Sequence, residues 1–294
     1  MNGQRPASST SLSSIHTHSR YCDGHGEIYE YVEAAMGAGL RAYGASGHAP
    51  LPFECDYAFP LASLDSYSAD VRLLATHYGD RFPILLGLEL DYLPGFTDFY
   101  QREFLSRQFD YFVASVHYVG EPNTEPWTYD ESDDTFVREV EKRHAGDYRP
   151  VVEDYYRRVL RLVDEVQGWP MPIVIGHLDR ITLWNRGDRY FPTDSGWYAG
   201  LVEEVLQAIS ATKLVVELNT SGWSKPAESP NPGLEILTNC AAKGIRTIIS
   251  ADAHRPVNVA ANYGRAIDLL RRAGYSEVVV PGRVGWGSGP LPDS

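Results

Sequence analysis

Short apolar segments alternate with longer amphipathic segments along almost the whole chain. The short segments are rich in Val, Ile, Leu or Tyr and are bounded by Gly, Ser or polar residues, a pattern that predicts buried strands. We expect seven of them, with Val278–Val280 as a further candidate. They lie at Leu12–Ile15, Leu40–Ala45, Ile84–Leu90, Tyr111–Val116, Ile173–Ile175, Leu214–Leu218 and Thr247–Ile249.

The longer segments have apolar residues at helical spacing, and several end beside a glycine that can serve as a C-cap. They lie at Ile28–Met36, Leu64–Tyr78, Val151–Val166, Tyr198–Ser210, Leu234–Ala242 and Val257–Ala273. Such repeated strand–helix alternation indicates a parallel sheet covered by helices. Because no glycine-rich phosphate loop follows the first strand, we expect a closed barrel rather than an open dinucleotide-binding sheet.

No strong boundary divides the chain, so we expect a single domain over residues 1–294. Its first ten residues or so and the tail after about residue 281 are predicted to be irregular. Residues 120–150 are acidic and are expected to form a loop. Within them, the charge run at 131–134 is typical of a solvated loop or of the start of a helix.

Composition and charge limit the class of protein. With 43% apolar and 22% charged residues, the chain can build a large core, which excludes a disordered, collagen-like or coiled-coil protein. The formal net charge of −13 argues against a nucleic-acid partner. Three cysteines form no disulfide framework, and neither a secretory signal nor an apolar stretch of membrane-spanning length is visible. We therefore expect a cytoplasmic protein with no membrane partner.

Most of the histidines fall at, or just after, the carboxyl end of a predicted strand. Seven of the nine do so, namely His16, His18, His25, His48, His117, His177 and His254, and the carboxylates of Glu89, Asp91 and Asp252 stand at the same level. In a parallel barrel these strand ends meet on one face, where active sites are built. We therefore expect residues that are distant in the sequence to converge there.

A protein core does not easily satisfy so many imidazoles and carboxylates without shared cations. A single strand-end histidine is more typical of a core or loop residue, so the inference depends on the whole set. One zinc ion takes about four ligands, so the seven histidines with Glu89 and Asp252 predict two or three divalent ions. Imidazole and carboxylate donors without thiolate are typical of zinc, iron or manganese.

Seven sequence strings resemble, in the same order, the motifs of the polymerase-and-histidinol-phosphatase (PHP) family, and more narrowly its histidinol-phosphate phosphatase branch. They are HTHSRYCDGHG, SGHAPLP, GLELDYLPG, ASVHY, IGHLD, ELNTSG and ISADAHRP, within residues 12–275. The resemblance implies a distorted (β/α)7 barrel with a trinuclear metal centre. Ser14 and Gly47 stand where many members have Asp, so we expect altered hydrogen bonding around the ligands.

By position, the resemblance implies a ligand set for each of three ions. The first ion is expected on His16, His18, Glu89 and Asp252, the second on Glu89, His117 and His177, and the third on His25, His48 and His254. It also implies hydrolysis of L-histidinol phosphate to L-histidinol and phosphate in histidine biosynthesis. The hypothesis is attack by a metal-bridging hydroxide. Asp252, His254 and a metal-bound water stay open as the group that protonates the leaving alkoxide.

Substrate contacts are predicted outside the metal ligands. Lys225 and Arg255 are the best placed to contact phosphate, and Arg186 is a weaker candidate. Asn219 is expected to orient the substrate or a ligand, or to cap the chain. Trp127 is expected to stack on an imidazole ring.

Three alternatives stay open. Another PHP phosphoesterase, acting on nucleotides or small phosphate esters, would differ in residues 120–150 and 222–232. An amidohydrolase-type barrel also begins with His-x-His, but it does not usually need His25, His48 and His254 as a third metal set. A regulatory metal-binding module without turnover would not need the complete ligand set.

Overall fold

A parallel six-stranded sheet forms the centre of the molecule in this computed structural model, which describes residues 11–120, 126–283 and 285–292. The strand order is β1-β2-β3-β6-β7-β8. The strands are β1 (Tyr43–Ala45), β2 (Ile84–Asp91), β3 (Tyr111–Ser115), β6 (Ile173–Ile175), β7 (Val215–Asn219) and β8 (Arg246–Ser250). Nearly all of their residues are buried, as in a sheet covered on both faces. Six of the seven predicted strands are thereby confirmed.

Residues 12–18 close this curled sheet into a distorted barrel. Ser14 forms a parallel bridge with Tyr43 in β1, and Thr17 forms one with Ala253, just after β8. The backbone N–H of His18 donates to the carbonyl oxygen of Ala253 at 2.9 Å. The predicted strand Leu12–Ile15 is thus an irregular segment that occupies the seventh strand position, and the predicted TIM-like barrel is confirmed.

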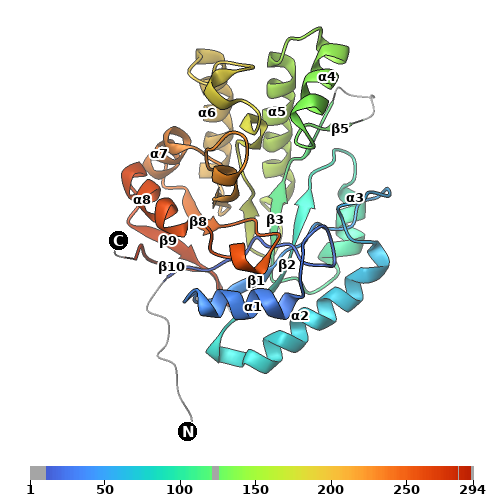
Figure 1. The fold of residues 1–294 in the computed structure, drawn as a ribbon, viewed down its shortest axis with the longest axis vertical. Helices are drawn as coiled ribbons and strands as arrows, with labels where there is room; N and C mark the ends of the chain where they lie inside the picture. The colour runs from blue at the N-terminus through green and yellow to red at the C-terminus, as the bar shows by residue number, and fades with distance from the viewer. Residues whose placement is uncertain (1–10, 121–125, 284, 293–294) are drawn as a thin grey trace.

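Helices surround the barrel (Figure 1). The main ones are α1 (Ile28–Gly37), α2 (Leu64–Tyr78), α5 (Arg149–Val166), α6 (Gly196–Ser210), α7 (Leu234–Ala242) and α8 (Tyr263–Ala273). In α5, Val152, Tyr155, Tyr156, Val159 and Leu162 are buried at helical spacing, which explains why this face packs on the sheet. The expected segment Val257–Ala273 forms a helix only from Tyr263 onward.

Shorter elements connect these helices and strands. They are α3 (Thr97–Tyr100), which continues as one π-helical turn (Gln101–Leu105), and six 3₁₀ turns at Leu61–Ser63, Gly79–Arg81, Arg180–Thr182, Arg186–Asp188, Ser221–Ser224 and Pro256–Asn258. Among the described residues, no helix combines the length and the apolar character that crossing a bilayer requires.

Tyr111 lies at the centre of the barrel interior. Its hydroxyl donates to the carbonyl oxygen of Ile15 at 2.6 Å. Gly44 and Gly87 leave room for its ring, because a Cβ at either glycine would lie 2.4 Å from a Tyr111 side-chain atom. Apolar side chains, including Val113, pack around it. This packing fills the barrel, so the polar site is confined to the carboxyl ends of the strands.

The tail after about residue 281 and the segment 120–150, both expected to be irregular, contain regular elements. Val278–Val280 lies in β9 (Glu277–Val280), which pairs antiparallel with β10 (Gly287–Pro290) and is not a strand of the parallel sheet. The expected irregular tail after about residue 281 is therefore wrong for β10. The expected loop at 120–150 contains β5 (Trp127–Thr128), which pairs with β4 (Tyr118–Val119), and the helix α4 (Asp133–His144). The first ten residues lie outside the described part of the chain.

The start of α4 explains the acidic run at 131–134. The Ser132 hydroxyl accepts a hydrogen bond from the backbone N–H of Thr135 and caps the helix. Asp133 and Asp134 occupy the first turn, where negative charge interacts favourably with the helix dipole. The run is therefore the beginning of a helix.

Candidate metal centre

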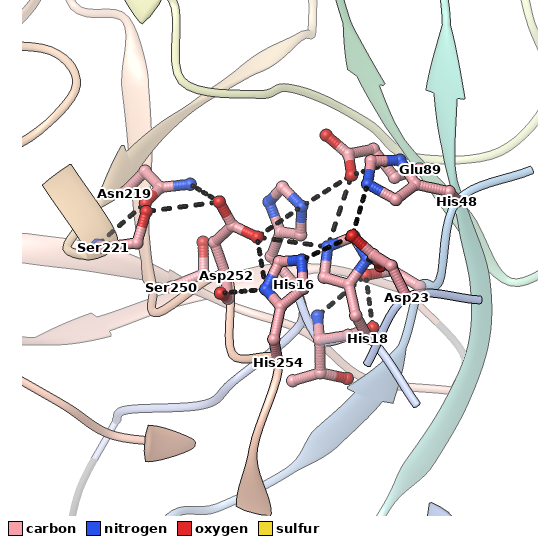
Figure 2. A network of polar contacts seen from close by, with 12 residues as sticks. His16, His18, Asp23, His48, Glu89, Asn219, Ser221, Ser250, Asp252 and His254 are labelled. Carbon is pink, nitrogen blue, oxygen red and sulfur yellow. Dashed lines mark hydrogen bonds and ion pairs between the residues drawn. The ribbon is translucent and has the colours of Figure 1, made fainter. Parts of the chain in front are cut away.

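A cleft of about 820 Å³ opens at the carboxyl ends of the barrel strands. Glu89 comes from the end of β2, His117 follows β3, His177 follows β6, and Asp252 and His254 follow β8. Figure 2 shows His16, His18, His48, Glu89, Asp252 and His254 with their side chains turned toward one another. The parallel topology thus brings together residues that are far apart in the sequence.

The ligating atoms form three overlapping groups. They are His16, His18 and Asp252; His48, Glu89 and His117; and His18, Asp23, His48 and His254. In each group, one ligand atom from every member lies within 4.8 Å of the others. In the first group, His18 Nε2 lies 3.1 Å from Asp252 Oδ1.

Glu89 belongs to the second group and also lies beside His16 of the first. Its Oε2 is 3.1 Å from His16 Nε2 and 3.1 Å from His48 Nδ1. Its Oε1 is 3.1 Å from His177 Nε2 and 3.6 Å from His117 Nε2. The two oxygens therefore face different sets of imidazoles, which is the arrangement that a carboxylate bridging two ions requires.

Several imidazole nitrogens at the centre have no hydrogen-bond partner among the described residues, although they are buried. They are His16 Nε2, His18 Nε2 and His48 Nδ1. In addition, His117 Nε2 and His177 Nε2 face each other at 3.2 Å. Buried nitrogen and carboxylate donors that converge without other partners fit divalent cations.

Buried carboxylates behind the imidazoles orient them. His16 Nδ1 lies 2.6 Å from Glu217 Oε1, and Asp91 Oδ1 contacts His117 Nδ1. Tyr57 donates to the other oxygen of Asp91 at 2.7 Å. A protonated Nδ1 held in this way leaves Nε2 with its lone pair directed at the centre. Glu217 was not singled out in the sequence, although a glutamate inside the apolar strand β7 is an unusual feature.

The centre is strongly ionic. Burial by itself lowers the pKa of His16, but the carboxylates of Glu217, Glu89 and Asp252 outweigh burial and hold that pKa well above its usual value. Burial raises the pKa of Asp252, but His16, His18 and His254 outweigh burial and hold it well below its usual range. Without ions, the carboxylate of Asp252 therefore stays ionised and its charge is balanced by a proton on imidazoles such as that of His16; bound cations would replace such protons.

Asp23, rather than His25, joins the third group. His25 is exposed, and its backbone is fixed because its N–H donates to the carbonyl oxygen of His254 at 2.7 Å. The turn before it directs the Asp23 carboxylate inward, so that Oδ2 lies 3.2 Å from His254 Nε2. The ligand role of His25 stays a prediction, and the structure adds Asp23 as a second candidate for the third ion. The CDGHG string contains both residues, and the sequence pattern alone does not choose between them.

The expected substrate contacts divide between the cleft and other surfaces. Lys225 and Trp127 line the cleft, but Arg255 is exposed and is not part of its lining. Arg186 lines a different cavity, and its Nη1 pairs with Glu228 Oε1 at 2.5 Å. The amide nitrogen of Asn219 lies 3.1 Å from Glu217 Oε2 and 3.4 Å from Asp252 Oδ2, so it bridges these two carboxylates.

Arg180 and Asp130 line the cleft and were not among the expected site residues. Arg180 follows His177 by three residues, in IGHLDR, so its place after a strand could have indicated it. Asp130 lies in the segment between β5 and α4, which was expected to be a loop. Its approach to Arg180 depends on tertiary structure.

The family model for the PHP domain matches residues 14–221. The chain belongs to the PHP family. Among curated relatives of this PHP protein, the probable histidinol-phosphatase of Deinococcus radiodurans is 29% identical over 273 residues, which cover 90% of this chain and 95% of the relative. The histidinol-phosphatase of Bacillus subtilis is 29% identical over 266 residues, which cover 84% of this chain and 95% of the relative.

A solved structure shows the same PHP fold. The histidinol phosphate phosphatase of Lactococcus lactis superposes with a TM-score of 0.68 at 21% identity, over 95% of this chain and 100% of that one. That protein was crystallised with zinc, L-histidinol and phosphate. The fold is thus shared over nearly the whole chain.

Proposed function

We propose that this PHP phosphoesterase hydrolyses L-histidinol phosphate to L-histidinol and phosphate. The observation that supports this most directly is the convergence of three ligand groups on the floor of one cleft. The curated relatives named histidinol-phosphatase, which match most of the chain, support the substrate. The zinc, L-histidinol and phosphate bound by the Lactococcus lactis protein agree with the same reaction.

We assign the ligand groups to three divalent ions, with zinc, manganese or iron as the metals that suit these donors. The first set is His16, His18, Glu89 and Asp252, the second is Glu89, His117 and His177, and the third is Asp23, His48 and His254. Such ions, when bound, activate a water molecule and neutralise charge on the phosphoryl oxygens.

Asp252 and His254 are the residues placed to move a proton to the leaving alkoxide. Asp252 Oδ1 faces His18, whereas its Oδ2 accepts a hydrogen bond from the Ser221 hydroxyl at 3.2 Å. The His254 side chain is 33% exposed and borders the cleft, so it can reach a bound ester. Lys225 and Trp127 provide a cation and an aromatic surface for the two parts of the substrate.

We propose that the chain works as one domain. The closing segment at 12–18 bridges β1 and the residues after β8, so the barrel needs both ends of the described chain. The PHP match itself ends at residue 221, but Asp252 and His254 complete the ligand groups. Function therefore requires residues on both sides of that boundary.

Phosphate release from L-histidinol phosphate tests the proposed reaction. We expect the purified protein to release phosphate from L-histidinol phosphate when zinc or manganese is added. The release should stop when a chelator removes the ions. Asp252→Asn should abolish release while the protein stays folded. No release by protein with confirmed bound ions would favour the amidohydrolase or the regulatory alternative.

A further inference from the structure

Arg180 and Asp130 form an ion pair on the wall of the cleft. Arg180 Nη2 and Nε each lie 3.3 Å from Asp130 Oδ2. The side chains are only 9% and 15% exposed, respectively. Arg180 begins a 3₁₀ turn just after the ligand His177, and Asp130 lies between β5 and α4. The pair thus lies between the metal-ligand groups and the helix that borders the cleft mouth.

One nitrogen of Arg180 is not satisfied by this pair. Nη1 is buried and has no hydrogen-bond partner among the described residues. It lies 3.8 Å from Asp252 Oδ2, which is beyond hydrogen-bonding distance. A buried charged donor without a partner is costly. Because this nitrogen lies beside the carboxylate of Asp252, an anion bound over the centre would satisfy it, and guanidinium matches phosphoryl oxygens well.

Asp130 would make the part of the cleft beside Arg180 selective for phosphate esters that also carry a positive charge. Only its Oδ2 contacts Arg180, and Oδ1 has no partner among the residues that the structure describes. A phosphoryl group beside Arg180 would also lie near this carboxylate, and two such anions repel each other. A positive group on the same substrate would remove the repulsion by binding Oδ1. A neutral ester offers no such compensation, and an unfavourable contact of this kind is a recognised source of specificity.

We infer that the Asp130–Arg180 pair binds both charged groups of the substrate. Arg180 Nη1 donates to a phosphoryl oxygen, and Asp130 Oδ1 accepts a hydrogen bond from a positively charged nitrogen of the same molecule. The substrate class is a short phosphate ester with an ammonium or imidazolium group. This inference rests on the proposed phosphatase activity and goes beyond it by naming the two residues that determine specificity.

Two esters that differ only by the ammonium group provide the first test, and it needs no variant. We expect the wild-type, metal-loaded protein to hydrolyse O-phosphoethanolamine with a kcat/KM at least ~10-fold above that for ethyl phosphate, since a charge-assisted hydrogen bond commonly contributes that much. Equal values for the two esters would overturn the inference. Poor hydrolysis of L-histidinol phosphate would reject only the proposed substrate. The comparison of the two simple esters tests the Asp130–Arg180 pair independently of that result.

Variants then separate the two roles. Asp130→Asn should lower kcat/KM for O-phosphoethanolamine at least ~10-fold and leave ethyl phosphate at its wild-type value or above. Arg180→Ala should lower kcat/KM for both esters. It should also weaken inhibition by inorganic phosphate at least ~10-fold, with unchanged metal content. Asp130→Asn should not weaken inhibition by phosphate. The assignment would be contradicted if Asp130→Asn lowered kcat/KM equally for both esters. It would also be contradicted if Arg180→Ala left inhibition by phosphate unchanged.

The Asp133–Arg189 pair supplies matched controls. Arg189 Nη1 lies 2.8 Å from Asp133 Oδ2, and neither residue lines the cleft. Asp133→Asn and Arg189→Ala should retain the wild-type preference between the esters. A loss of preference in these controls would show that charge changes act from outside the cleft, and it would overturn the assignment to Asp130 and Arg180.

Discussion

Glu217 Oε1 lies 2.6 Å from Nδ1 of His16, and both side chains are fully buried beneath the metal-ligand groups. The other oxygen of Glu217 accepts a hydrogen bond from the backbone N–H of His177 at 2.7 Å. One carboxylate therefore orients His16, a proposed ligand of the first ion, and the backbone at His177, a proposed ligand of the second. It also explains why a charged residue is kept inside β7.

Replacing this carboxylate should weaken metal binding. Glu217→Gln keeps the size of the side chain but removes the charge that holds the proton on His16 Nδ1. Partners of this kind commonly change metal affinity ~10–100-fold, and we expect a loss in that range by competition with a chromophoric chelator. Glu203→Gln, at an exposed residue that pairs with Lys243, is the control. Unchanged affinity in Glu217→Gln would show that His16 is oriented without it.

The third ligand group predicts a difference between two neighbouring residues. Asp23→Asn should lose one ion per chain, because the Asp23 carboxylate lies between His48 and His254. His25→Asn should retain all ions, because His25 belongs to none of the three ligand groups among the described residues. Metal analysis after dialysis measures both. The reverse pattern would establish His25 as the ligand.

Removal of the ions should destabilise the fold. Ions that bind only the folded state stabilise it by about 4 kcal/mol at a thousandfold excess over the dissociation constant. For a chain of this size, this corresponds to a decrease in the unfolding temperature of roughly 10 °C on chelation. Differential scanning calorimetry of loaded and chelated protein measures it. The His77→Gln variant, at a residue in α2, should show the same decrease, and identical unfolding temperatures with and without ions would contradict ion binding by the barrel.

The close packing around Tyr111 predicts that Gly87 does not tolerate an added methyl group. Gly87→Ala would place a Cβ 2.4 Å from the ring of Tyr111, and overpacking of this kind costs about 1–3 kcal/mol. Gly200→Ala, in α6 with no atom within 4 Å of the added Cβ, should not destabilise the protein. Urea denaturation compares the two variants. Equal stability of the two variants would show that the Tyr111 ring moves aside without a loss in the free energy of unfolding.

Much of the barrel is predictable because strand burial and helix amphipathicity are local patterns. β6 and α7 match the expected ranges residue for residue, and Glu89 and Asp252 lie together, because parallel strands align their carboxyl ends. Local patterns also place Trp127 and Lys225 after strands, and both line the cleft.

Other features depend on tertiary contacts that no local pattern contains. Asp23 and His25 are two residues apart, and the path of one turn decides which of them faces the centre. The Asp130–Arg180 pair joins residues 50 positions apart. Arg186 has the same charge as Arg180, but it faces a separate cavity, where it pairs with Glu228. Sequence reasoning identifies these residue types without assigning their partners.

A cleft that is fitted to L-histidinol phosphate should prefer it strongly over other phosphate esters. The most direct measurement is kcat/KM of the metal-loaded protein for L-histidinol phosphate beside a nucleoside monophosphate and simple phosphate esters. We predict a preference of at least ~10³-fold, because only a fitted pocket discriminates that strongly. Uniformly slow hydrolysis of every ester would contradict the assigned substrate and leave a PHP phosphoesterase of another specificity.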